Sequence, residues 1–434
     1  MWFSLVKKAL KVIFQNCKMQ VFKFGGASVK DANGIKNMVS VLQKVGCKNT
    51  LIVVSAMDKT TNALEEVVHN YFNNKKELQS SIQDVKKYHN SVLLDLFDDE
   101  NIEAFKKTAL LFDELNGFLK SNKSPDYNFV YDQVVCYGEL VSTTIISEYL
   151  NSIGIKNNWV DAREHIKTDS YYRRGNVNWE DTQALITKSL NKSVLNITQG
   201  FLGSDTNNFT TTLGREGSDY TAAIYAYCLN ATSVTIWKDV PGVLNADPRY
   251  FENAQLLNNI SYREAIELAF YGASVIHPKT LQPLQQKEIP LFVKSFLEPE
   301  NPGTKVGKDL VLSPNIPCFI VKKNQVLISL SSLDFSYIVE ENISEIFNLL
   351  HIHKMKVDVI QNSAISFSVC VDNIYNTLEN LLLQLKAKFK VSFHDNVSLY
   401  TIRHYNAHVI NQLEKGKTVL LKQLTQDTVQ IITK

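Results

Sequence analysis

One segment of the chain combines a cation, small polar residues and an apolar run in a way that suits anion binding. Arg215 precedes Ser218 and Asp219, and the run from Tyr220 to Leu229 predicts a buried helix with one of these two small residues at its N-cap. The N-terminus of a helix presents unpaired N–H groups and a partial positive charge, so it attracts anions. An arginine just before it can hold a carboxylate or a phosphate through two parallel hydrogen bonds.

A second segment follows shortly and has the composition of a nucleotide-holding loop. Residues Val234 to Trp237 predict a buried strand, and Lys238, Asp239 and a Pro-Gly turn come directly after it. The segment ends in Asp-Pro followed by Arg249. The two segments together indicate a phosphotransferase site.

A third element lies near the start of the chain, where Lys23 is followed by Gly25 and Gly26. Glycines let backbone N–H groups approach a phosphate closely. The loop lacks the Walker A pattern, and taken alone it is better interpreted as a plain strand-to-helix turn. It gains weight because it opens a βαβ unit in a chain that also carries the other two segments.

Glu139 lies within an otherwise apolar helix predicted over Tyr131 to Ile153. A carboxylate in such a place is costly unless it is paired. Two interpretations stay open: an internal ion pair, for instance to Arg215, or a receptor for a substrate ammonium group. Residues Ser55 to Asn62 follow a buried strand, where α/β proteins bind ligands, and the threonines within them are also suited to cap a helix.

The elements that would position these residues predict an α/β domain with a largely parallel sheet. A strand at Gln20–Phe24, a helix at Asp31–Val45 and an apolar strand at Thr50–Ala56 form the first βαβ unit. The polar helical pattern from Leu64 to Lys120 predicts a helical insertion. Further strands are predicted at Asn158–Asp161, Val194–Thr198 and Val234–Trp237, with Pro290–Phe296 as the last.

The polar, Pro- and Gly-rich stretch Glu298–Thr304 predicts a domain boundary. Beyond it the pattern reads βαββαβ, which is the ferredoxin-like arrangement, with strands at Lys390–Phe393 and Val397–Arg403 treated as separate elements. We therefore expect a catalytic domain over residues 19–300, a ferredoxin-like domain over 312–395 and a shorter second unit over 396–434. Residues 1–18 are interpreted as an upstream extension or a mis-assigned start, and less readily as a basic surface helix.

The composition excludes several function classes. The 434 residues carry 46 basic and 44 acidic side chains, so the chain has no overall attraction to nucleic acid. Its six cysteines form no metal or disulfide pattern, and its nine histidines support no metal site or catalytic triad. No apolar run reaches the length of a membrane span. These features predict a cytoplasmic protein.

The motifs, in their order along the chain, closely resemble those of the aspartate kinases in the amino acid kinase family. The matching segments span the whole first domain: Lys23–Ser28, Val54–Met57, Thr61–Asn62, Gly138–Glu139, Thr198–Phe201, Thr211–Ala222, Trp237–Arg249 and Gly272–Thr280. The tail resembles the paired ACT regulatory domains of such kinases. The resemblance implies the amino acid kinase fold and phosphorylation of the L-aspartate side chain by ATP, the first step toward lysine, threonine and methionine.

The resemblance also implies residue roles. Lys23 and Asp219 would be catalytic, with Asp219 orienting the Lys23 region. The substrate-binding residues would be Ser28, Thr61, Glu139, Arg215 and Ser218. The ATP-binding residues would be Lys23, Gly25, Gly26, Lys238, Asp239, Arg249, Ser274 and Lys279. Mg²⁺ is expected through the ATP phosphates, without protein ligands of its own. The chemistry is consistent, because a carboxylate nucleophile is already ionised at neutral pH and needs charge cancellation rather than a base.

The sequence departs from the family pattern at several positions. Ala27 replaces a usual threonine in the glycine loop, Glu216 stands where glycine is usual, and Ser274 replaces a frequent lysine. Lys238 or Lys279 could restore the lost cation. Residues Asn362–Ala364 replace a Ser/Thr-Ser-Glu pattern near the effector sites of relatives, so the identity of any amino-acid effector stays open.

Three alternatives remain. Another amino acid kinase, such as glutamate 5-kinase or acetylglutamate kinase, would share the fold, but the Trp-Lys-Asp-Val-Pro-Gly loop, the insertion and the tail disfavour it. A non-catalytic amino-acid sensor is kept open by Glu216 and Ser274. A membrane-associated protein has only residues 1–18 in its favour. Pairing of ACT domains across subunits predicts a homodimer, and the sequence shows no homoserine dehydrogenase half, which predicts a monofunctional enzyme.

Overall fold

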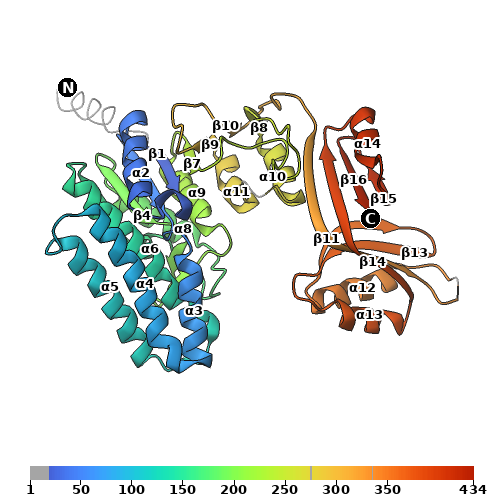
Figure 1. Ribbon diagram of the computed structural model, residues 1–434, viewed down its shortest axis with the longest axis horizontal. Coiled ribbons are helices and arrows are strands. Elements are labelled where there is room, and N and C mark those ends of the chain that lie inside the picture. Colours follow the sequence, from blue (N-terminus) through green and yellow to red (C-terminus); the bar gives the residue numbers. More distant parts are fainter. Residues whose placement is uncertain (1–18, 274–275, 335) are drawn as a thin grey trace, which may run out of the picture. The chain divides into compact units, whose positions relative to one another are not determined.

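The computed structural model describes residues 19–273, 276–334 and 336–434 (Figure 1). They form two compact units, each built from separate stretches of the chain. The first unit holds residues 19–243, 256–266 and 276–311, and the second holds 244–255, 267–273 and 312–434. The extension predicted over residues 1–18 lies outside the described residues. The domain boundaries drawn from the sequence stay a prediction.

The first unit is built on an eight-stranded sheet in the order β3-β4-β2-β1-β7-β9-β10-β8. Every neighbouring pair is parallel except β9 and β10, which confirms the largely parallel sheet. Its strands are β1 (Gln20–Phe24), β2 (Thr50–Val54), β3 (Asn157–Val160), β4 (Leu195–Gln199), β7 (Val234–Lys238), β8 (Asn259–Ser261), β9 (Leu291–Ser295) and β10 (Thr304–Gly307). The expectation that Pro290–Phe296 holds the last strand was wrong, because β10 follows the Pro- and Gly-rich stretch and pairs with β9.

Helices surround this sheet, and a small hairpin of β5 (Leu202–Ser204) and β6 (Thr210–Thr212) lies beside it. The helical elements are η1 (Gly26–Val29), α2 (Ala32–Val45), α3 (Thr60–Asn73), α4 (Lys75–Leu96), α5 (Glu103–Ser121), α6 (Tyr127–Ser152), α7 (Ala162–His165), α8 (Trp179–Ser189), α9 (Gly217–Leu229), α10 (Tyr262–Tyr271) and α11 (Pro278–Gln286). From Glu267 onward α10 belongs to the second unit. All five residues of β2 are buried, as expected for a strand covered on both faces.

The predicted helical insertion is a bundle of α3, α4 and α5 packed on α6 (Figure 1). Amphipathic α3, α4 and α5 bury one face each, whereas α6 is apolar nearly all round and lies in the core. Polar residues within α6 are therefore placed where they must find partners inside the protein.

Four strands end together at one edge of the sheet. The registers pair Phe24 with both Val54 and Trp237, and Val54 with Gln199, so β1, β2, β4 and β7 stop at the same level. Loops that follow parallel strands at such an edge lie close together, and this is where open α/β sheets bind ligands. The glycine loop follows β1 and the second predicted anion-binding segment follows β7, whereas the segment with Arg215 follows β6, after the hairpin that comes next along the chain from β4.

The second unit holds a six-stranded antiparallel sheet in the order β12-β13-β11-β14-β16-β15, with three helices. The elements in chain order are β11 (Cys318–Ser331), α12 (Glu340–Ile352), β12 (Lys356–Asn362), β13 (Ser366–Asp372), α13 (Leu378–Lys386), β14 (Lys390–Arg403), α14 (Ala407–Glu414), β15 (Val419–Leu424) and β16 (Thr428–Thr433). The predicted βαββαβ order is confirmed from β11 to β14.

The split of β14 into two strands was wrong. One long strand pairs with β11 along both of its halves: Cys318–Lys322 faces Leu399–Arg403, and Leu327–Ser331 faces Lys390–His394. The shorter second unit predicted from the sequence therefore takes an additional strand from the first part of β11. Each half has its own apolar cluster, one under α12 and α13 and one under α14.

Candidate active site

A buried ion pair lies at the shared strand edge. The Nζ atom of Lys23, on β1, is 2.7 Å from Oδ1 of Asp219, and both side chains are nearly buried. Lys238, the last residue of β7, places its Nζ atom 3.9 Å from Oδ2 of the same carboxylate. Asp219 thus lies between two ammonium groups that come from adjacent parallel strands.

The glycine loop is pressed against the loop that follows β2. A Cβ atom on Gly26 would lie 2.7 Å from the carbonyl oxygen of Ala56, and the Gly26 carbonyl accepts a 3.2 Å hydrogen bond from the Asp58 N–H. A Cβ atom on Gly25 would lie 3.3 Å from Nζ of Lys23. The bare backbone of this loop and the Lys23 ammonium are therefore adjacent, which is an arrangement that can hold a phosphate.

Glu139 lies in the buried part of α6, close to the same edge. Burial raises the pKa of its carboxyl to about 8, although a hydrogen bond from the Ala56 backbone and the charge of Lys23 both oppose the rise. Its Oε2 atom is buried and has no hydrogen-bond partner. Among the described residues no ion pair joins it to Arg215, so the internal pair considered from the sequence is not formed.

The helix at the centre of the first motif begins earlier than predicted. The first residue of α9 is Gly217, so Ser218 and Asp219 lie in its first turn, and the expectation that one of them is the N-cap was wrong. Glu216 takes the N-cap position in a left-handed conformation with φ of 53° and makes no side-chain cap. Arg215 is exposed just before it, and no ion pair within the described residues engages it.

The N-terminus of α9 is fixed on the loop after β4. A Cβ atom on Gly200 would lie 2.4 Å from the Ser218 side chain, so only glycine fits there. The hydroxyl of Thr221 accepts a 2.8 Å hydrogen bond from the Phe201 N–H. This close packing fixes the first turn of α9 relative to the strand edge.

The other predicted site residues are dispersed around this edge. Ser28 donates a 3.4 Å hydrogen bond to the Trp237 carbonyl, which ties the glycine loop to β7. Thr61 is half-buried as the second residue of α3, which begins at Thr60 after an uncapped Lys59, so the predicted threonine cap was wrong. Asp239 is exposed immediately after β7.

The last three residues predicted to bind ATP lie in three different parts of the chain. Lys279, in the first turn of α11, places its Nζ atom 5.9 Å from the centre of the Tyr220 ring on α9. Arg249 belongs to the second unit, where it is exposed and paired with Asp247 at 2.6 Å. Ser274 lies outside the described residues.

Thr143, a residue that the sequence did not single out, is the centre of a hydrogen-bond network one turn beyond Glu139. The Thr143 hydroxyl donates to the Glu139 carbonyl at 2.8 Å and accepts from Trp159 Nε1 at 3.0 Å and Gln199 Nε2 at 2.8 Å. It links α6 to β3 and β4 and so supports the turn that carries Glu139. The sequence did carry a signal for Thr143, because it is a polar residue on an apolar helix, one turn from a buried carboxylate.

A second missed residue is Asp132, which is buried on α6. Its carboxylate accepts hydrogen bonds from the N–H groups of Arg173 and Thr212 and from the Thr212 hydroxyl, all between 2.8 and 2.9 Å. Burial still raises its pKa to about 6. Asp132 joins α6 to β6, the strand that leads into Arg215 and α9.

The described residues bear on two further properties, metal binding and membrane insertion. No group of three or more His, Cys, Asp and Glu side chains in them is placed to hold a metal ion. None of the described helices is both long enough and apolar enough to cross a membrane.

Comparisons with known proteins agree with this geometry. Residues 18–295 match the model of the amino acid kinase family. Lysine-sensitive aspartokinase 3 of Escherichia coli is 30% identical over 404 residues, which cover 88% of this chain and 86% of that protein. Aspartokinase 1 of Arabidopsis thaliana is 32% identical, over 81% of this chain and 63% of the plant protein.

Solved structures give the same result. The crystal structure of E. coli aspartokinase III in complex with lysine and aspartate has a TM-score of 0.81 at 27% identity and covers 95% of both chains. The structure of the same enzyme with aspartate and ADP has a TM-score of 0.77 at 26% identity, with 96% of both chains covered. The strand-edge site and these matches together show that the chain belongs to the amino acid kinase family and, within it, to the aspartokinases.

Proposed function

We propose that this chain transfers the γ-phosphoryl group of ATP to the side-chain carboxylate of L-aspartate. The observation that carries the proposal is the grouping of the Lys23–Asp219 ion pair, the glycine loop and the buried Glu139 carboxyl, whose Oε2 atom has no hydrogen-bond partner, at one strand edge. Cations and bare backbone suit a phosphoryl group, and a buried carboxylate with one unpaired oxygen suits an ammonium group. The site therefore has receptors of both signs, as an amino-acid phosphotransferase requires.

The acceptor side follows from the charges. A carboxylate nucleophile is ionised at neutral pH, so the enzyme has no proton to remove and must instead offset the repulsion between two anions. Arg215, exposed and unpaired before α9, is proposed to hold the α-carboxylate of aspartate, with Ser218 beside it. Glu139 is proposed to bind the α-ammonium group, while Thr61 and Ser28 help to seat the amino acid.

The donor side rests on the lysines and the glycine loop. Lys23 with the backbone at Gly25 and Gly26 would hold the transferring phosphoryl group, and Asp219 would keep the Lys23 ammonium in place. Lys238 and Lys279 are proposed as further phosphate contacts. Asp239, Arg249 and Ser274 remain proposed ATP contacts on the resemblance alone.

The residues present suit a nucleotide that brings its own metal. When bound through the ATP phosphates, Mg²⁺ would neutralise part of their charge. No described carboxylate cluster competes for that role. Asp219 is already balanced by Lys23 and Lys238, so it is better suited to orient these ammonium groups than to coordinate a metal.

We further propose a homodimer that binds an amino-acid effector in the second unit and works in the cytoplasm. An aspartokinase relative has been crystallised with lysine bound, which supports an effector for this chain. The edge strands β12 and β15 of the second sheet have open ladders that a second copy could extend. The described cysteines are all free thiols, as expected in a reducing compartment.

The test is turnover of ATP with Mg²⁺, with the acyl phosphate trapped by hydroxylamine, for L-aspartate, L-glutamate, N-acetylglutamate and no acceptor. We expect hydroxamate with aspartate alone. Lys23→Met should reduce turnover by about 10²-fold or more, whereas Lys87→Met, at an exposed position on α4, should not. Folded protein that binds aspartate but makes no hydroxamate would overturn the proposal in favour of a sensor.

The two additional lysines can be tested separately. Lys238→Ala and Lys279→Ala should each raise the KM for ATP, because each removes a cation near the first turn of α9. If both variants keep the wild-type KM for ATP and the wild-type turnover, neither lysine replaces the cation that relatives carry at position 274.

A further inference from the structure

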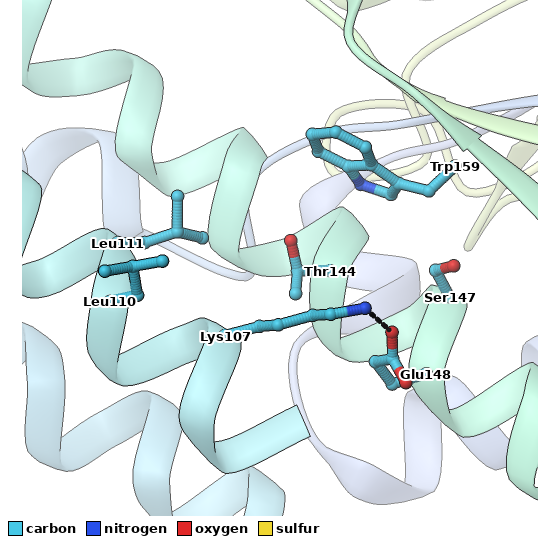
Figure 2. Close-up of a pocket in the computed structure, with 7 residues that line it drawn as sticks. All are labelled: Lys107, Leu110, Leu111, Thr144, Ser147, Glu148 and Trp159. Atoms are coloured by element: carbon cyan, nitrogen blue, oxygen red, sulfur yellow. Dashed lines mark hydrogen bonds and ion pairs between the residues drawn. The ribbon is translucent and has the colours of Figure 1, made fainter. Parts of the chain in front are cut away.

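A cavity lies in the first unit beside β3, the outermost strand of the sheet. It has a volume of about 240 Å³ and is formed by α5, α6 and the edge strand β3. Figure 2 shows Trp159 on one side, Leu110 and Leu111 on another, and Lys107 reaching across to Glu148. The proposed phosphotransferase site uses none of these side chains.

The charged wall of the cavity is a pair that can open at little cost. Lys107 Nζ and Glu148 Oε1 are 2.7 Å apart, and the lysine side chain is 47% exposed. Exposed pairs of this kind contribute about 1 kcal/mol or less to stability. A ligand that offers its own carboxylate to the lysine and its own ammonium to the glutamate can therefore replace the pair contact by contact.

The remaining wall of the cavity is mainly apolar. The Trp159 N–H is already donated to Thr143, and the Ser147 hydroxyl is already donated to Asn157. Leu110, although 59% exposed, faces this cavity and adds apolar surface. The groups left for a ligand are thus one cation, one anion, the Thr144 hydroxyl and an apolar surface of indole and leucine.

We propose that this cavity binds a free α-amino acid with an apolar side chain. The ligand carboxylate contacts Lys107, its ammonium group contacts Glu148, and its side chain packs against Trp159 and the two leucines. The volume is close to that of one amino acid and too small for a nucleotide. The strand-edge site, lined by two lysines and a buried glutamate, selects a polar amino acid instead, so the two sites have different specificities.

Calorimetric titration of the full chain tests the proposal. L-Phenylalanine and L-leucine are the probes, and 3-phenylpropionate and phenethylamine each lack one of the two charges. We expect saturable binding of the amino acids in the millimolar range or tighter, and binding at least about tenfold weaker for both analogues. If L-phenylalanine binds no more tightly than 3-phenylpropionate or phenethylamine, the two-charge assignment is wrong.

Matched variants locate the site. Lys107→Gln and Glu148→Gln should each weaken phenylalanine binding at least about tenfold, whereas Lys106→Gln, exposed on the same helix, should not. Saturating L-aspartate should leave phenylalanine binding unchanged, and so should Lys23→Met. The proposal is wrong if the cavity variants bind as well as the wild type, if aspartate displaces phenylalanine, or if no saturation occurs in folded protein. None of these outcomes depends on kinase activity.

Discussion

The buried Glu139 carboxyl gives the proposed substrate site a pH dependence that can be worked out from the structure. Desolvation raises its pKa from an ordinary 4.5 to about 8. At pH 7 only about a tenth of the ligand-free protein therefore carries the carboxylate, and at pH 6 about a hundredth. Because the ammonium group of aspartate needs the ionised form, the apparent Kd should fall about tenfold per pH unit up to pH 8 and then level off.

Proton release is the direct assay. An ammonium group beside Glu139 stabilises the carboxylate, so binding of aspartate at pH 7 should release close to one proton, and binding at pH 9 almost none. Calorimetric titrations in two buffers of different ionisation enthalpy measure this number. Glu139→Gln is the control, since it cannot titrate and should show no release from this position. A wild-type Kd that is constant between pH 6 and 8.5, or no proton release at pH 7, would refute the reasoning.

The same shift affects stability with a sign that can be checked. The native pKa is raised, so the native state binds more protons than the unfolded state between pH 4.5 and 8. The contribution of this group to the free energy of unfolding is fully present below pH 4.5 and is lost as the pH rises through 8. The difference between the two pKa values corresponds to about 5 kcal/mol, an upper bound for a fully buried group. Relative to the wild type, Glu139→Gln should gain stability against urea over this range.

Three further variants test single features. Asp219→Asn should leave the Lys23 ammonium without its counter-charge and reduce kcat by about 10²-fold in the hydroxamate assay; unchanged kcat would exclude an orienting role. Glu216→Gly should raise the free energy of unfolding by about 1 kcal/mol in urea melts, because it relieves a left-handed conformation; an unchanged or lower value would contradict this. Thr143→Val should cost about 1 to 3 kcal/mol and raise the Kd for aspartate, since it removes the support of the Glu139 turn; equal Kd values would show that this support is not needed.

Strand and helix positions could be predicted well where local pattern and tertiary context agree. Apolar runs such as Thr50–Val54 are strands because both faces of a parallel sheet are covered. Two strands were predicted in place of β14 because the residues between them, His394, Asp395 and Asn396, are types that are common in turns. In the structure Asn396 does have a positive φ of 51°, but the strand continues through a register shift opposite Gln325 and Leu327, which pair with Val397 and His394. That compensation comes from a partner far away in sequence.

The candidate site was predictable in its residue types and less so in its contacts. The Lys23–Asp219 pair joins residues that are far apart along the chain, and no local pattern encodes such a distance. The start of α9 was misplaced because Glu216, a poor residue for a left-handed position, occupies one. Thr143 was missed because two of its three hydrogen-bond partners lie on strands β3 and β4, and only the third lies on its own helix.

The topology of the sheet explains why two lysines converge on one carboxylate. β1 and β7 are parallel neighbours with Phe24 opposite Trp237, so the residues around these positions share one edge whatever their separation in sequence. A lysine placed at the end of β7 is therefore delivered to the same side of α9 as Lys23, at 3.9 Å from Asp219. Lys238 therefore adds positive charge at the edge where the proposed function brings two substrate anions together, and a phosphotransferase that moves no proton gains most from charge cancellation there.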